Sequence, residues 1–210
     1  MNELLNLKAL SDSPINNQPY PFFVVEQSIN EEKIAAVMKD FPAISDGGSY
    51  TLEGLTTGPS FDALLDELNG TEFRQQVSQK LDVDLNTLPM IVTLRGISRP
   101  KDGRIHTDSK SKIATILIYF NEPWTAETGH LRVLNSDNMD DVVAEVAPNA
   151  GTMIAFKVTD NCWHGYPAYD GVRRSIQINF VADDQAVKKH HNRHGWTAKL
   201  KNLKNLFSNN

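Results

Sequence analysis

The chain has 210 residues, of which 40% are hydrophobic and 22% are charged, close to the composition of ordinary globular proteins. It contains no run of about 18 apolar residues, which excludes a transmembrane helix of the usual kind. Its one cysteine, Cys162, excludes an intramolecular disulfide and suits a reducing compartment. The first residues lack the basic and apolar regions of a signal peptide, so we expect a cytoplasmic protein of one domain.

The formal net charge of −5 is unevenly distributed. All 26 acidic residues lie at or before Asp184, whereas six of the 21 basic residues lie in 185–210. The body is therefore acidic and the tail is basic. An acidic body argues against binding to nucleic acid, because a face that contacts phosphates needs clustered positive charge.

The first 89 residues are expected to form one strand and a helical support layer. Residues 1–20 are polar and suggest a loop, and the aromatic and β-branched residues of 21–26 predict a strand. Helices are predicted over 31–40, 61–69 and 72–81. Their expected caps are Asn30, Ser60 and Thr71, residues whose side chains can accept hydrogen bonds from backbone N–H groups.

From residue 90 the pattern changes to short strands separated by Gly, Pro and Asn or Asp clusters, with no helices between them. This pattern predicts an antiparallel sandwich or barrel, with 90–183 as its catalytic core. A basic helix over 184–210 would close the chain and could pair two copies in a homodimer. The predicted strands are 90–97, 112–120, 130–134, 142–146, 152–158 and 173–181.

Three residues form a candidate metal site. His106 and Asp108 are two positions apart, so on an extended strand their side chains leave the same face. His164 lies far along the chain, yet both ligand segments adjoin predicted strands, whose ends meet at the mouth of a jelly roll. Two imidazoles and one carboxylate form the facial triad of non-haem Fe(II) oxygenases. The alternative is that these are polar loop residues and a core histidine.

An arginine nine residues beyond His164 could bind an anionic co-substrate. In the strand 173–181, Arg173 shares a face with the polar side chains of Ser175 and Gln177, while Arg174 shares the opposite face with apolar residues. A guanidinium binds a carboxylate through two hydrogen bonds, as binding of 2-oxoglutarate would require. The pattern favours Arg173 over Arg174, although an ordinary surface arginine is the plainer alternative.

Together these motifs resemble the Fe(II)/2-oxoglutarate oxygenases, in the prolyl-hydroxylase-like branch. The resemblance covers roughly residues 90–183, about half of the chain. The segments that carry it are His106-Thr107-Asp108, Tyr119-Phe120-Asn121-Glu122, Gly129-His130-Leu131-Arg132, Gly151-Thr152-Met153-Ile154-Ala155-Phe156, Trp163-His164-Gly165 and Arg173-Arg174-Ser175-Ile176-Gln177.

The resemblance implies a double-stranded β-helix (jelly roll) with helices packed on one face. It implies that His106, Asp108 and His164 hold Fe(II) and that Arg173 binds the C5 carboxylate of 2-oxoglutarate. Tyr119 lies where this branch often places a hydroxyl on the same carboxylate, although a core tyrosine is an equal reading. The implied reaction consumes O2 and 2-oxoglutarate, releases succinate and CO2, and hydroxylates an unactivated C–H bond, with ascorbate as a possible reductant.

Some features stay open at this stage. Thr128 replaces the first glycine of a Gly-Gly pair found in many relatives, which leaves a role for His130 undecided, and Cys162 is read as a small buried hydrophobe. The tail histidines His190, His191 and His194 are read as surface residues. A ring of cations near His106 could meet an anionic substrate or be solvated. Its members are Arg95, Arg99, Lys101, Lys110 and Lys112.

Three functions compete. The first is a hydroxylase acting on a prolyl residue, an amino acid or a carbohydrate-linked metabolite. The second is a cupin-like metal-binding jelly roll, acting as an isomerase or a binding module, which would not need Arg173 opposite the metal. The third is a regulatory protein that docks a partner through its basic tail.

Overall fold

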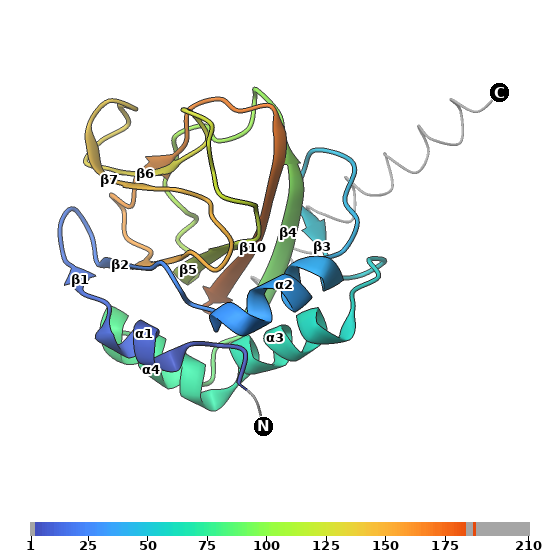
Figure 1. Cartoon of the computed structure of the whole chain (residues 1–210). Helices are drawn as coiled ribbons and strands as arrows, with labels where there is room; N and C mark the ends of the chain where they lie inside the picture. The colour runs from blue at the N-terminus through green and yellow to red at the C-terminus, as the bar shows by residue number, and fades with distance from the viewer. Residues whose placement is uncertain (1–2, 184–186, 188–210) are drawn as a thin grey trace.

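The computed structural model describes residues 3–183 and Val187. Two antiparallel sheets face each other, and the helices α1 to α4 gather on the outer side of the larger one (Figure 1). The predicted jelly roll is confirmed. The predicted helix over 184–210 and the dimer contact assigned to it lie outside the described residues, apart from Val187.

The larger sheet has seven strands in the order β1-β2-β8-β5-β10-β4-β3. Strand β10 pairs on one side with β5 and on the other with β4, so the C-terminal strand of the described chain lies between two strands from earlier in the sequence. The strands are β1 (Ile15–Asn16), β2 (Phe22–Val25), β3 (Tyr50–Thr51), β4 (Met90–Ser98), β5 (Lys112–Tyr119), β8 (Met153–Lys157) and β10 (Gly171–Val181).

The smaller sheet has the order β7-β6-β9 and is extended by one isolated bridge. Its strands are β6 (Leu131–Leu134), β7 (Val142–Val146) and β9 (His164–Gly165). The bridge joins His106 to His164, so the backbone around His106 continues this sheet beyond β9. The six strands predicted over 90–181 are all present, with ends that differ from the predicted ones by at most two residues.

The helices begin at backbone positions other than those the sequence suggests. They are α1 (Leu7–Asp12), α2 (Glu31–Asp40), α3 (Pro59–Asn69) and α4 (Thr71–Leu81). Gly58 and Gly70 precede α3 and α4, so Ser60 and Thr71 lie inside the first turn, and their prediction as caps was wrong. Asn30 does precede α2, but its amide donates to the Glu3 carbonyl and makes no cap bond.

The reading of residues 1–20 as a loop was also wrong. Helix α1 is only six residues long, and the Asn6 side chain caps it by accepting a hydrogen bond from the Ala9 N–H at 3.0 Å. Strand β1 then pairs with β2 over two residues. Elements this short show no recognisable hydrophobic periodicity in the sequence. Their stability comes from packing on the rest of the protein.

Alternating side chains divide the molecule into two apolar cores. The even-numbered side chains of β5, such as Ile116 and Ile118, face the helices and are fully buried there. The odd-numbered ones, such as Leu117 and Tyr119, face the smaller sheet. The helices thus cover one face of the large sheet and leave its other face for the site between the sheets.

Phe120 packs the helical layer against the large sheet, and its truncation should lower the stability of the fold. It is 1% exposed, and its ring centroid lies 5.4 Å from that of Phe41 and 6.0 Å from that of Phe61. Phe120→Ala is expected to lower the free energy of unfolding by about 3 to 5 kcal/mol, measured by urea denaturation. Val143→Ala, at a residue 41% exposed on β7, serves as the control and should change it by less than about 0.5 kcal/mol.

Candidate active site

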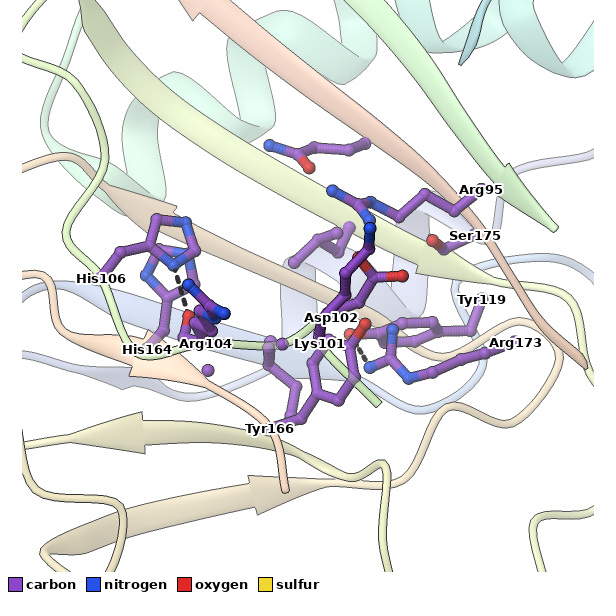
Figure 2. A pocket seen from close by; sticks show the side chains of 15 residues that line it. Arg95, Lys101, Asp102, Arg104, His106, Tyr119, His164, Tyr166, Arg173 and Ser175 are labelled. Atoms are coloured by element: carbon purple, nitrogen blue, oxygen red, sulfur yellow. Dashed lines mark hydrogen bonds between the residues drawn. The ribbon is translucent and has the colours of Figure 1, made fainter. Parts of the chain in front are cut away.

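A cavity of about 300 Å³ opens between the two sheets (Figure 2). His106 and His164 lie at one end of it, and Arg173 and Tyr119 lie at the other. Its floor is the inner face of the large sheet, where Ser175 and Gln177 of β10 are flanked by β4 and β5. The cavity therefore brings together residues as far apart in sequence as Arg95 and Gln177.

Backbone pairing places the two histidines side by side. The His106 N–H donates to the His164 carbonyl at 3.0 Å, and the His164 N–H donates to the His106 carbonyl at 3.1 Å. Because residues paired in this way project their side chains to the same face, the two imidazole centroids are 4.3 Å apart. His164 is buried, whereas more than half of the His106 side chain is exposed to the cavity mouth.

Both imidazoles are held through Nδ1. The Nδ1–H of His106 donates to the Arg104 carbonyl at 2.9 Å, and that of His164 donates to the Cys162 carbonyl at 2.8 Å. This pairing leaves the Nε2 lone pairs free, which is how metal-binding histidines are normally oriented. Burial lowers the pKa of His164 to about 4, so its imidazole is neutral and able to coordinate near neutral pH.

Asp108 completes the group. One ligand atom from each of His106, Asp108 and His164 lies within 4.8 Å of the other two. The carboxylate also accepts hydrogen bonds from Lys112 Nζ at 2.6 Å and from Thr115 Oγ1 at 2.5 Å. Burial by itself would raise the pKa of Asp108, but Lys112, His164 and Thr115 outweigh it and lower that pKa, so the carboxylate is charged.

Arg173 is buried at the far end of the cavity. Its Nε donates to the Gly129 carbonyl at 2.9 Å, and its guanidinium carbon lies 3.9 Å from the ring centroid of Tyr166. The planar guanidinium is thus held by stacking and by one backbone acceptor, and among the described residues no carboxylate pairs with it. Arg174 is exposed and does not line this cavity.

Tyr119 lies beside this arginine. A terminal nitrogen of Arg173 is 3.5 Å from the Tyr119 hydroxyl oxygen. Burial raises the pKa of Tyr119, so the hydroxyl remains protonated and can donate a hydrogen bond. The structure thus places a cation and a hydroxyl donor together, on the opposite side of the cavity from the histidines (Figure 2).

Two other candidates from the sequence, Cys162 and His130, do not line the cavity. Cys162 is fully buried, as expected, and its Sγ accepts from the Asp108 N–H at 3.4 Å. His130 Nδ1 lies 3.8 Å from a Glu145 oxygen and does not line the cavity. The tail histidines lie outside the described residues.

Sequence reasoning missed two supporting residues. Thr115, which binds Asp108, lies on the same face of β5 as Tyr119, and the period of two along that strand would have identified it. Tyr166, which stacks on Arg173, lies two residues after His164 and had no comparable signal.

A jelly roll with two imidazoles and a carboxylate at its mouth is the arrangement of non-haem Fe(II) oxygenases. Residues 96–181 match the family model of the 2OG-Fe(II) oxygenase superfamily, where 2OG denotes 2-oxoglutarate. This part of the chain is therefore similar to the oxygenases of that superfamily, which use Fe(II) with 2-oxoglutarate as co-substrate. No curated protein matches it in sequence.

Solved structures of prolyl hydroxylases share the fold at low sequence identity. A Pseudomonas putida prolyl-4-hydroxylase matches with a TM-score of 0.55 and 17% identity, over 77% of this chain and 92% of its own. A viral collagen prolyl hydroxylase from Paramecium Bursaria Chlorella virus-1, solved with 2OG, gives 0.52 and 14%, over 77% and 96%. A Phytophthora capsici prolyl 4-hydroxylase gives 0.53 and 16%, over 77% and 58%.

Within the described chain, no helix combines the length and the apolar character needed to cross a membrane.

Proposed function

We propose that this chain is a dioxygenase that hydroxylates an unactivated C–H bond of a small-molecule or peptidyl substrate and converts 2-oxoglutarate and O2 to succinate and CO2. In this proposal His106, Asp108 and His164 hold Fe(II), and Arg173 and Tyr119 bind the C5 carboxylate of 2-oxoglutarate. The observation that carries it is one cavity with two histidines of the candidate triad at one end, where a ligand atom of Asp108 lies within 4.8 Å of theirs, and an uncompensated guanidinium at the other end.

The donor set suits Fe(II). Two neutral imidazole nitrogens and one carboxylate are ligands that this ion accepts, and a triad of this kind leaves adjacent positions for a chelating co-substrate and O2. Each donor is oriented by a further partner, namely the Arg104 and Cys162 carbonyls for the imidazoles and Lys112 with Thr115 for Asp108. Such outer partners fix ligand geometry before the metal arrives.

The far end of the cavity suits the distal carboxylate of 2-oxoglutarate. Arg173 is 3% exposed, so its charge acts in a medium of low dielectric. Its attraction to a carboxylate is therefore stronger than that of a surface arginine. The Gly129 carbonyl accepts only the Nε–H, which leaves the terminal N–H groups available to donate two hydrogen bonds to a carboxylate. The Tyr119 hydroxyl adds a neutral donor beside them.

When bound, Fe(II) and 2-oxoglutarate supply the oxidising chemistry, in which one atom of O2 enters succinate and the other enters the new hydroxyl group. The chain contributes positioning. Arg173 and Tyr119 set the direction of the co-substrate, and Leu117 and Leu131 line the space between the two ends with apolar surface that restricts water. Ascorbate would serve only to keep the iron reduced.

The test is an anaerobic titration of the purified protein with Fe(II), with and without 2-oxoglutarate. Chelation of 2-oxoglutarate to Fe(II) gives a weak visible charge-transfer band, which we expect to appear only when both are present. Metal binding without that band would overturn the oxygenase proposal and leave a cupin-like metal-binding jelly roll. With the band established, release of succinate can be used to screen prolyl peptides, amino acids and carbohydrate-linked metabolites.

A further inference from the structure

Three cations at the cavity have no role in the proposed binding of Fe(II) or 2-oxoglutarate. Arg95, Lys101 and Arg104 line the cavity, and within the described part of the chain their side chains form no hydrogen bond or salt bridge, although the charge of Arg95 helps to lower the pKa of Asp102. The one carboxylate in the lining, that of Asp102, accepts from Arg99 Nε and from an Arg99 terminal nitrogen, both at 3.0 Å. The lining therefore has an excess of positive charge.

Arg95 is built into the floor of the cavity. In the large sheet Arg95 of β4 pairs with Ser175 of β10, which pairs in turn with Tyr119 of β5, so the three side chains form one row across the inner face. Figure 2 shows the guanidinium of Arg95 extending into the space between the histidines and Arg173. Lys101 and Arg104 belong to the loop that follows β4 and leads to His106, and both are exposed at the mouth.

Beside Arg95 lies an unused polar atom. The Oγ of Ser175 is buried without a hydrogen-bond partner, and the residue is 1% exposed. A buried hydroxyl without a partner costs free energy, so such atoms are rare unless a ligand satisfies them. The row thus offers a guanidinium and a hydroxyl next to each other, separate from the Arg173 guanidinium.

Binding of the co-substrate does not neutralise the positive charge of these three cations. On the proposed function, the formal charges of Fe(II), the 2-oxoglutarate dianion, Asp108 and Arg173 cancel. Arg95, Lys101 and Arg104 then remain as three positive charges around the space where the second substrate must enter. In a concave site with low-dielectric walls, such a group attracts an anion and raises its local concentration.

We infer that the substrate hydroxylated by this enzyme carries an oxyanion, a carboxylate or a phosphate, that binds Arg95 at the cavity floor with Lys101 and Arg104 at the mouth. This inference rests on the proposed function. It narrows the substrate to acidic molecules, such as an acidic sugar, a sugar phosphate or a compound with a free carboxylate next to the reacting carbon, and disfavours neutral internal peptide segments.

The experiment uses the full chain loaded anaerobically with Fe(II) and 2-oxoglutarate, and measures binding of matched probes by calorimetry. The pairs are N-acetylproline with N-acetylprolinamide, and glucuronate with glucose. Glucose 6-phosphate and inorganic phosphate distinguish a phosphate site from a carboxylate site. We expect the anionic member of at least one pair to bind about tenfold more tightly than its neutral partner, with an affinity that falls as salt rises.

Variants distinguish binding of the anion at Arg95 from nonspecific attraction by positive charge elsewhere on the protein. Arg95→Gln should remove the preference for anions, and Arg95→Lys should retain part of it, because the charge remains without the planar fork. Arg104→Gln, on an exposed loop, should weaken it without any risk to folding. Lys39→Gln on α2 removes one positive charge from the helical side and should leave the preference unchanged.

The two proposals fail in different ways. If the charge-transfer band does not form before any probe is added, the proposed function fails and this inference falls with it. If the band forms, but anionic and neutral probes bind equally, no anionic probe binds, or Arg95→Gln has no effect, the anionic substrate is wrong and the oxygenase proposal stands.

Discussion

His164→Ala is expected to abolish Fe(II) binding and, with it, all consumption of 2-oxoglutarate. His164 is one of three candidate ligands, and its position depends on a backbone bridge to His106 that the substitution would leave intact. Loss of an outer partner alone typically lowers metal affinity 10- to 100-fold, so loss of a ligand should lower it by more than about 100-fold. Anaerobic titration with Fe(II), followed by calorimetry, measures this directly.

The matched control is His130→Ala. His130 immediately precedes β6 of the small sheet, but it does not line the cavity. We expect this variant to bind Fe(II) as the unchanged protein does. Circular dichroism of both variants would show that the fold is kept. Unaltered Fe(II) affinity in a folded His164→Ala protein would remove His164 from the metal site and contradict the triad.

Local periodicity explains why much of the site could be predicted from sequence. The period of two along 173–181 separates Arg173 from Arg174, and the structure places Arg173 in the cavity and Arg174 on the exposed face. The same rule applies to Tyr119, whose neighbours Ile118 and Phe120 face the helices. Where a strand has one polar and one apolar face, its own residues determine which side chains can reach the site.

Features that depend on contacts between distant segments could not be predicted in this way. The bridge between His106 and His164 arises only because the loop before β5 pairs with β9, and nothing in either segment specifies the other. The stacking of Tyr166 on Arg173 and the hydrogen bond from Arg173 to Gly129 likewise join three separate loops or strands. The closure of the two sheets creates these contacts.

The same limit applies to charge. The sequence places Arg95, Arg99, Lys101, Lys110 and Lys112 near His106 but does not say which of them are already paired. The structure pairs Arg99 with Asp102, Lys110 with Asp160 and Lys112 with Asp108, and leaves Arg95 and Lys101 at the cavity. Only this separation of paired from unpaired cations makes an anionic substrate a specific inference.

Arg173→Gln is expected to weaken 2-oxoglutarate binding by about 10- to 100-fold while leaving Fe(II) affinity unchanged. The substitution removes a buried charge that could form two charge-assisted hydrogen bonds with the distal carboxylate, and each factor of ten corresponds to about 1.4 kcal/mol. Glutamine keeps a donor for the Gly129 carbonyl, which limits the effect on folding. The intensity of the charge-transfer band as a function of 2-oxoglutarate concentration gives the affinity.

Two comparisons make the Arg173 result specific. Arg174→Gln removes the same charge from the next position of β10, where the side chain is exposed and does not line the cavity, and should leave 2-oxoglutarate affinity within about twofold. Pyruvate retains the 2-oxo acid end but lacks the distal carboxylate, so its weak binding should be the same in the unchanged protein and in Arg173→Gln. Equal losses for pyruvate and 2-oxoglutarate would mean that Arg173 supports the cavity in general, and a larger loss in Arg174→Gln would transfer the role to Arg174.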